Sequence, residues 1–266
     1  MKIGVVGCAG RMGRMLVQTI AATDGVVLVG GTEQPGHPAI GADVGLQSGA
    51  SACGVSVGDD PQRLFAEADA VIDFTVQAVA RRHAELAARH KAALVIGTTG
   101  LEPDDQAAIA SAARVVPVVQ AANMSVGVNL LLGLTEQVAA RLGDDYDIEI
   151  VEMHHRHKVD APSGTALALG RAAAAGRGTS LDSVAQRVRD GRIGARRQGD
   201  IGFATLRGGD VVGEHTVIFA SDGERIEITH RATARTIFAR GAVRAALWTR
   251  AQPPGLYSMR QVLGLD

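Results

Sequence analysis

A run of basic side chains, His154-His155-Arg156-His157-Lys158, follows an apolar stretch near the middle of the chain. Three kinds of site fit it: a metal centre, a solvated basic surface, and an acid–base centre for an anionic substrate. Adjacent histidines alternate in direction along a strand and no cysteine is near, which disfavours a metal centre. Neighbouring cations repel one another, which lowers the pKa values of His and Lys unless an anion is present. We therefore expect the cluster to bind an anionic substrate, and we expect no metal.

The segment after the basic cluster has the composition of a helix N-terminus. Pro162 precedes Ser163, Gly164 and Thr165, whose hydroxyl and backbone N–H groups can hold a carboxylate. Ser163 also fits an ordinary N-cap residue, and both interpretations remain open. A histidine with an ordinary pKa of about 6.5 can donate a proton at neutral pH. Cluster and helix together favour a site that binds and protonates a small acid.

Glycines in the pattern Gly7-x-x-Gly10-x-x-Gly13 follow an apolar run at the N-terminus. The first N–H groups of a helix carry partial positive charge, and glycine lets a pyrophosphate approach them closely. The first step is one residue longer than in the usual dinucleotide fingerprint, and alone the pattern also fits a tight strand-to-helix turn. Glu33 ends the next apolar run, where a carboxylate can accept from an adenosine ribose hydroxyl. The combination predicts a dinucleotide-binding site.

The residues around Glu33 leave the choice between NADH and NADPH open. A cation after the acid would favour a 2′-phosphate, but Gln34 is neutral. Arg11, at the start of the expected helix, is a candidate partner for phosphate. Small residues at 97–100 and 121–124 follow later apolar runs. At the carboxyl ends of parallel strands they would let the backbone approach a nicotinamide ring.

Apolar runs and helical patterns alternate through the first half of the chain. We expect buried strands at 2–7, 26–32, 71–74, 93–97 and 115–119. Helices are expected up to about residue 22 and at 76–90 and 103–113, with mainly loop at 36–58. This alternation is typical of a Rossmann-like α/β fold with a doubly wound parallel sheet.

The pattern changes after about residue 125. We expect helices at 126–142, 163–175 and 238–249, and a strand at 147–153. Residues 176–200 are basic and rich in glycine, which predicts a mobile loop. Three antiparallel strands are expected at 201–206, 214–220 and 225–231. The second part of the chain is therefore expected to be an α+β domain with an open mixed sheet.

Composition excludes several classes of function. The 27 Lys and Arg residues balance 28 Asp and Glu, which disfavours a nucleic-acid or membrane-surface binder. Aromatic residues make up only 3%, too few for base-stacking platforms. No apolar run approaches the roughly 18 residues of a membrane span, and the N-terminus lacks the features of a signal peptide. Two cysteines cannot form a disulfide framework, so we expect a reducing, cytoplasmic setting.

Several of these segments resemble the 4-hydroxy-tetrahydrodipicolinate reductases, the dihydrodipicolinate reductase family of bacterial lysine and diaminopimelate synthesis. The most specific runs from Glu152 to Thr165 and reads Glu-Met-His-His-Arg-His-Lys-Val-Asp-Ala-Pro-Ser-Gly-Thr. The others lie at 7–13, 72–75, 96–100, 121–125, 202–205, 213–216, 227–230 and 238–242. The resemblance covers nearly the whole chain.

This resemblance implies an enzyme that uses NADH or NADPH to reduce the cyclic imine or enamine left when hydroxy-tetrahydrodipicolinate loses water. By the same resemblance His154 is the proton donor and acceptor, Lys158 is a second proton donor, and His155, Gly164 and Thr165 contact a small dicarboxylate substrate. The implied cofactor contacts are Gly7, Cys8, Ala9, Gly10, Arg11, Met12, Glu33, Gln34, Gly97, Thr98, Thr99, Ala121, Ala122, Asn123 and Met124.

The resemblance also implies a domain organisation. Residues 1–125 and 234–266 would form the dinucleotide-binding domain, and residues 126–233 the domain for substrate binding and oligomerisation. Family members are commonly homotetramers built through the sheet of the second domain. Gln34 stands where relatives that use NADPH often carry Arg, and Met124 stands where many members have Phe.

Two alternatives come from the residues alone. The generic first domain also fits another two-domain NAD(P)-dependent dehydrogenase of a small amino or keto acid. A non-catalytic NAD(P) sensor is the second alternative, which the intact histidine segment disfavours. Protection by pyridine-2,6-dicarboxylate in a melting assay would separate a dicarboxylate enzyme from the first alternative.

Overall fold

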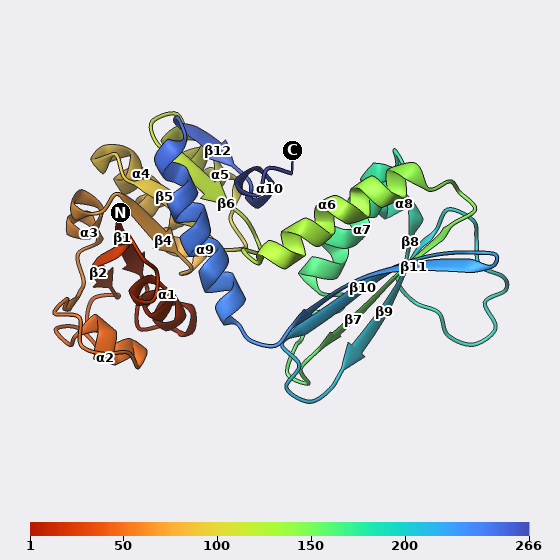
Figure 1. Ribbon diagram of the computed structural model, residues 1–266, viewed down its shortest axis with the longest axis horizontal. Helices are drawn as coiled ribbons and strands as arrows, with labels where there is room; N and C mark the ends of the chain where they lie inside the picture. Colours follow the sequence, from red (N-terminus) through yellow and green to blue (C-terminus); the bar gives the residue numbers. More distant parts are fainter. Residues whose placement is uncertain (266) are drawn as a thin grey trace. The chain divides into compact units, whose positions relative to one another are not determined.

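Figure 1 shows the computed structural model of the chain, which describes residues 1–265. The chain folds into two compact units. The first unit contains Met1–Val126 and the segment from Thr236 onward, and the second unit contains Gly127–Arg235. Within residues 1–265, no helix combines the length and apolar character needed to cross a bilayer.

The first unit is built on a sheet of seven strands in the order β12-β6-β5-β4-β1-β2-β3, all paired in parallel. The strands are β1 (Lys2–Val6), β2 (Val27–Thr32), β3 (Val57–Gly58), β4 (Ala70–Asp73), β5 (Ala93–Ile96), β6 (Pro117–Gln120) and β12 (Gly255–Tyr257). The predicted doubly wound parallel sheet is confirmed. The short edge strands β3 and β12 were not predicted, because two or three residues carry too little periodicity to be seen in sequence.

Helices cover both faces of this sheet (Figure 1). They are α1 (Arg11–Ala21), α2 (Val44–Ser48), α3 (Pro61–Glu67), α4 (Gln77–His90), α5 (Pro103–Ala112), α9 (Thr236–Trp248), the 3-10 turn η1 (Thr249–Ala251) and α10 (Met259–Val262). Helix α3 lies in a stretch for which no element was predicted. Its start is a common one, since the Asp60 carboxylate accepts from Gln62 N and Pro61 occupies the first turn.

Two apolar clusters hold this unit together, one on each face of the sheet. Val71 of β4 belongs to the cluster with α3, α4 and α5, whereas Ile72 belongs to the cluster with α1 and α9. Successive side chains of a strand point to opposite faces, so both faces of β4 are buried. This explains why the central strands read as continuous apolar runs rather than as alternating ones.

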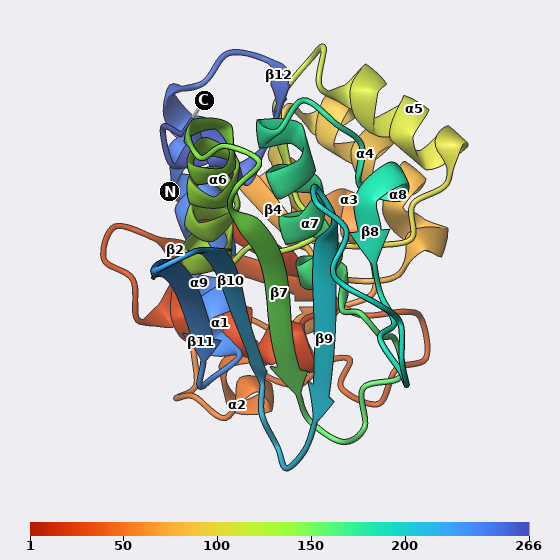
Figure 2. The same cartoon turned by 90° about the vertical axis from the view of Figure 1, so that its right-hand side faces the viewer.

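The second unit is built on a sheet in the order β11-β10-β7-β9-β8, shown side by side in Figure 2. The strands are β7 (Asp147–His154), β8 (Ala185–Gln186), β9 (Ile201–Arg207), β10 (Gly213–Ser221) and β11 (Glu224–Ala232). Strand β10 is antiparallel to both β7 and β11. The predicted open mixed sheet is confirmed.

The expectation of three antiparallel strands is wrong for β9. This strand is parallel to β7 and to β8 and does not pair with β10. The chain between β7 and β9 contains α7 (Gly164–Gly176), α8 (Leu181–Val184) and β8. It is long enough for the crossover that a parallel pair requires.

The predicted mobile loop at 176–200 is also wrong in part, because it contains α8 and β8. Arg189 binds Glu149 through two contacts of 2.7 Å. Arg196 contacts Asp147 at 2.7 Å and Glu149 at 3.0 Å. The basic residues that suggested a solvated loop therefore bind the segment to β7.

Helices α6 (Val126–Arg141) and α7 lie on one face of the second sheet (Figure 1). The core on that face includes Ile150 of β7, Phe203 of β9, Phe219 of β10 and Leu169 of α7. Side chains of the opposite face are half-buried or exposed; they include Val151, Met153, Ala204, Leu206, Thr216 and Ile218. In this sheet the alternation of strand residues therefore separates a helix-covered face from an open one.

Candidate functional site

The predicted cofactor residues of the first unit follow the carboxyl ends of neighbouring parallel strands. The glycine loop follows β1, Glu33 follows β2, Gly97 follows β5 and Ala121 follows β6. Parallel strands bring these ends to one edge of the sheet, which is where ligands bind in open α/β folds. The fold thus places residues that are far apart in sequence along one edge.

The glycine loop has the geometry that its spacing predicts. Gly7 adopts φ +68, a left-handed conformation that glycine tolerates. A Cβ at Gly13 would overlap the Gly7 carbonyl oxygen and would lie 2.6 Å from Cys8 Cα. Gly10 is the N-cap of α1 and has no side chain to satisfy the first N–H groups. The start of α1 can therefore approach an anion closely.

Glu33 contacts the glycine loop directly. Its Oε1 accepts a hydrogen bond from Ala9 N at 2.8 Å, while Gly7 N and Cys8 N donate to Thr32 O. Burial, followed by the nearby Glu33 charge, raises the pKa of the Cys8 thiol to about 12. Since the Cys8 side chain is buried and protonated, only its backbone is suited to contact a ligand.

A cavity of about 480 Å³ opens beside this loop. Four predicted cofactor residues line it: Gly7, Gly10, Glu33 and Gln34. His37 and Arg82 also line it, and sequence reasoning did not single them out. Arg82 comes from α4, and a helix surface cation gives no signal in sequence that it faces a cavity.

Asp73, at the end of β4, binds three nearby residues at the carboxyl edge of the sheet. It accepts hydrogen bonds from Thr75 N at 2.8 Å and from Thr98 Oγ1 at 3.2 Å, and it contacts His83 Nδ1 at 2.8 Å. Burial acts to raise the pKa of Asp73, but the hydrogen bonds and charge of His83, with the bonds of Thr75, hold the pKa below its usual value. An ionised carboxylate thus positions the predicted residue Thr98.

The remaining predicted residues of the first unit differ in exposure. Arg11, Thr99 and Ala122 are exposed; Met12, Gly97, Ala121 and Asn123 are half-buried. Met124 is buried and packs against α9, where a Cβ on Gly241 would overlap its carbonyl oxygen. The Met124 side chain is thus part of the core of the first unit.

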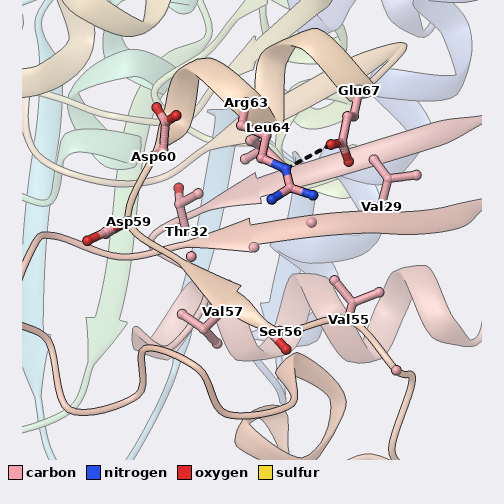
Figure 3. A pocket seen from close by; sticks show the side chains of 14 residues that line it. Val29, Thr32, Val55, Ser56, Val57, Asp59, Asp60, Arg63, Leu64 and Glu67 are labelled. Atoms are coloured by element: carbon pink, nitrogen blue, oxygen red, sulfur yellow. Dashed lines mark hydrogen bonds and ion pairs between the residues drawn. The ribbon is translucent and has the colours of Figure 1, made fainter.

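A second cavity, of about 510 Å³, lies between α3 and the β2–β3 edge (Figure 3). Its charged residues include Arg63 and Glu67, which pair with each other at 3.0 Å. None of the predicted site residues lines it. This cavity is therefore not the site that the sequence predicts.

In the second unit, His154 ends β7 and its partner is Glu152, two residues earlier on the same face. Nδ1 of His154 lies 2.5 Å from Oε2 of Glu152. Glu152 is 1% exposed and accepts further hydrogen bonds from Arg207 and from Ser163 N. Burial acts to raise the pKa of Glu152, but the Arg207 and His154 bonds outweigh burial and hold the pKa below its usual value.

An ionised Glu152 fixes the tautomer of His154. A carboxylate only accepts hydrogen bonds, so Nδ1 of His154 must carry the proton and Nε2 is the nitrogen that exchanges one. A Cβ on Gly213 would lie 3.0 Å from that Nε2, so a glycine there keeps the space beside it open. Burial lowers the pKa of His154 and the Glu152 bond and charge act against this. The repulsion expected between basic residues is thus offset by a carboxylate of the chain itself.

A second buried imidazole, His215, lies edge-on to His154 with ring centroids 5.1 Å apart. Its Nε2 is 3.0 Å from Ser163 Oγ, and that hydroxyl accepts a hydrogen bond from Ala166 N as the N-cap of α7. Burial, followed by the His154 charge, lowers the pKa of His215 to about 4. His215 is therefore neutral at physiological pH and serves to position Ser163.

The other predicted substrate residues lie close to His154 in the chain. Lys158 Nζ contacts both oxygens of Asp160, at 2.8 and 2.9 Å. His155 is held by its backbone N, which donates to Val211 O at 2.7 Å. Gly164 and Thr165 form the first turn of α7, and nothing lies within 4 Å of a Cβ built on Gly164. The helix N-terminus thus has open space beside it that an anion can use.

Sequence reasoning missed Glu152, Asp160, Arg207 and His215 as site residues. A signal for Glu152 existed: it is a charged residue on the strand face that also carries Ile148 and Ile150. Arg207 lies opposite His154 in the β7–β9 register. That pairing depends on the parallel crossover, so nothing in the local sequence predicted it.

Comparisons with known proteins cover nearly the whole chain. Family models match residues 1–124 as "Dihydrodipicolinate reductase, N-terminus" and residues 127–263 as "Dihydrodipicolinate reductase, C-terminus". The chain is 59% identical over 263 residues to the 4-hydroxy-tetrahydrodipicolinate reductase of Dinoroseobacter shibae, covering 99% of this chain and 98% of that one. It is 57% identical to the enzyme of the same name from Ruegeria pomeroyi, with the same coverage.

A solved structure shares the fold. Dipicolinate-bound dihydrodipicolinate reductase from Paenisporosarcina sp. TG-14 superposes with a TM-score of 0.79 and covers 97% of each chain. Its sequence identity is 23%, so this likeness bears on the fold alone.

Proposed function

The chain belongs to the dihydrodipicolinate reductase family, and we propose that it reduces dehydrated hydroxy-tetrahydrodipicolinate to tetrahydrodipicolinate with NADH or NADPH. The reaction adds a hydride and a proton across a double bond of a cyclic imine or enamine. It is a step of lysine and diaminopimelate synthesis. The observation that carries the proposal is the Glu152–His154 pair beside Lys158 and the N-terminus of α7.

The first unit fits a nicotinamide dinucleotide. The uncapped start of α1 suits the pyrophosphate, and Glu33 lines the adjacent cavity where a ribose hydroxyl can donate to it. Gly97–Thr99 follow β5, the neighbour of β4, and Ala121–Met124 follow β6, the neighbour of β5, at the same sheet edge. The nicotinamide cofactor, when bound, supplies the hydride.

The second unit supplies the proton and holds the dicarboxylate. His154 releases a proton from Nε2, because Glu152 occupies Nδ1 and stabilises the imidazolium form by its charge. Lys158, whose Nζ pairs with Asp160, supplies a second N–H that can donate a proton. His155, Lys158 and the first N–H groups of α7 at Gly164 and Thr165 bind the substrate carboxylates.

We also propose that the protein is a cytoplasmic homotetramer. The open face of the second sheet, with exposed Leu206 and half-buried Val151, Met153 and Ile218, supports a homotetramer built through this sheet. Leu206→Glu would place a charge on that face, and sedimentation should then show smaller species than the wild type. A tetramer of unchanged mass would contradict this interface.

Both cysteines are free thiols, which supports a cytoplasmic enzyme.

The test of the proposed function is a coupled assay with enzymatically generated substrate, comparing NADH and NADPH oxidation. We expect substrate-dependent oxidation of at least one cofactor, and protection by pyridine-2,6-dicarboxylate in a thermal melt. A chain that binds NADH but does not oxidise it in the presence of this substrate would be a sensor rather than a reductase. An absent melting shift with the pyridine dicarboxylate would point to another substrate class.

A further inference from the structure

Arg207, the last residue of β9, lies between the partners of both proposed proton donors. Its Nη1 and Nη2 donate to Oε2 and Oε1 of Glu152 at 2.8 and 2.9 Å, a two-point contact. Nη2 also donates to the backbone carbonyl of Asp160 at 2.8 Å. One guanidinium therefore reaches the carboxylate behind His154 and the residue that holds Lys158.

Within residues 1–265, Arg207 is the permanently charged side chain that pairs with Glu152, and His154 is its other ion-pair partner. Glu152 accepts two hydrogen bonds from Arg207, one from His154 and one from Ser163 N. Without Arg207, the buried carboxylate would keep His154 as its titratable partner and would lose its permanent countercharge. A buried carboxylate that loses its cation is strongly destabilised, so its side chain would move or draw a proton.

At Asp160, Arg207 binds the loop backbone rather than a charged side chain. The Asp160 carboxylate is 56% exposed and holds Lys158 Nζ with both oxygens. The Arg207 bond to the Asp160 carbonyl fixes the backbone from which that carboxylate extends. Arg207 thereby sets the position of the Lys158 ammonium group without touching it.

We propose that Arg207 is a positioning residue that sets the placement of both His154, through Glu152, and Lys158, through Asp160. This inference rests on the proposed function for its kinetic consequence. The relative placement of the two proton donors then depends on a single guanidinium from another strand. Removal of Arg207 should therefore affect both donors together.

Arg207 also affects the pH dependence of His154. The charged and titratable groups around His154 are Glu152 on the same strand, Arg207 on β9, His215 on β10, and Lys158 with Asp160 on the following loop. Among them Arg207 lowers the pKa of His154 and Glu152 raises it. Replacing Arg207 by a neutral residue should therefore move the pKa of His154 upward. Because looser packing around the imidazole would act in the same direction, the ring tautomer of His154 is the readout that separates the two causes.

The test compares Arg207→Ala and Arg207→Lys with a matched control, Arg225→Ala. Arg225 lies on the same sheet and its exposed guanidinium pairs only with Glu227 among the contacts described for residues 1–265. We expect Arg207→Ala to lower kcat by roughly 100-fold, since small misplacements of catalytic groups have effects of this size. NADH affinity should stay within about twofold, and the pKa in the kcat/KM profile should rise.

Arg207→Lys restores a charge but not the two-point contact, so we expect it to recover part of kcat and to return the pH profile toward the wild type. Arg225→Ala should match the wild type in every measurement. If Arg207→Ala does not fold, Arg207→Lys and Glu152→Gln carry the same test, because each keeps the volume of the site.

A second readout separates this inference from the proposed function. Selective ¹⁵N labelling of histidine reports which ring nitrogen of His154 carries the proton, whether or not the chain turns over substrate. We expect Nδ1–H in the wild type and a mixture of tautomers in Arg207→Ala. A wild type without reductase activity would refute the proposed function alone. Wild-type kcat, pH profile and tautomer in Arg207→Ala would refute the role of Arg207.

Discussion

His154 shows how much of its chemistry is set by side chains outside the basic cluster. The four residues that follow it in sequence are basic, but its closest charged partner is the buried carboxylate of Glu152. That carboxylate directs proton exchange to Nε2, and burial keeps the pKa of His154 below its usual value. The basic cluster supplies charge for the substrate, while Glu152 and Arg207 supply the geometry.

Cofactor choice is also decided by single residues, at the end of β2. Replacing exposed Gln34 by Arg would place a guanidinium next to Glu33, within the cavity that Gln34 lines. A charge-assisted hydrogen bond to a 2′-phosphate is worth about 1.5–3 kcal/mol, so we expect the affinity for NADPH relative to NADH to rise about tenfold or more. Fluorescence titration with both cofactors measures this ratio. Gln34→Met is the control that removes the amide without adding charge, and an unchanged ratio in Gln34→Arg would show that this position does not face the 2′ group.

Among the elements, the turn from β1 into α1 makes the strictest demand on residue type. A Cβ at Gly13 would overlap the Gly7 carbonyl oxygen, so Gly13→Ala must displace α1 from β1. We expect a loss of about 1–3 kcal/mol in the free energy of unfolding, as overpacked sites show, and a loss of NADH affinity of tenfold or more. Gly58→Ala is the matched control, because nothing lies within 4 Å of its Cβ. Urea unfolding and NADH titration check both effects, and equal values for the two variants would contradict this account of the turn.

Among the helices and strands, the sequence predicted those that are long and whose buried residues recur at a regular spacing. β1, β4, β5 and the helices α4 and α5 were predicted within one or two residues of their observed ends. It failed for β3, β8 and β12, whose formation depends on a neighbouring strand rather than on their own pattern. The predicted antiparallel direction of β9 is wrong for a related reason. Pairing of β9 with β7 instead of β10 is decided by how α7 packs on the sheet.

Some residues of the candidate site could likewise be predicted from the sequence, and others could not. Groups that act from one continuous segment, such as His154, Lys158 and the glycine loop, were visible in the residue types and their spacing. Asp73 and Arg207 were not visible, because each acts through partners brought together by sheet register. Sequence alone therefore reveals the reacting groups better than the residues that position them.

For the whole molecule, buried histidines make stability depend on pH. His215 has a pKa of about 4 when folded and an ordinary value of about 6.5 when unfolded, so the unfolded chain binds more protons between these values. Stability is therefore retained above about pH 6.5 and falls as the pH drops through this window. Between pH 7 and 5 we expect His215 to account for about 2 kcal/mol of lost unfolding free energy. Urea titrations of wild type and His215→Gln measure this, and equal pH slopes for the two proteins would disprove the assignment.

The most direct test of the central claim is the turnover of His154→Ala and Lys158→Ala with enzymatically generated substrate, alongside their NADH affinity. Loss of a positioned proton donor should lower kcat by about 10²- to 10⁴-fold while NADH binds as in the wild type. Arg225→Ala, which removes an exposed cation that pairs with Glu227 outside the cluster, should keep wild-type kcat. Wild-type turnover in both His154→Ala and Lys158→Ala would contradict the account.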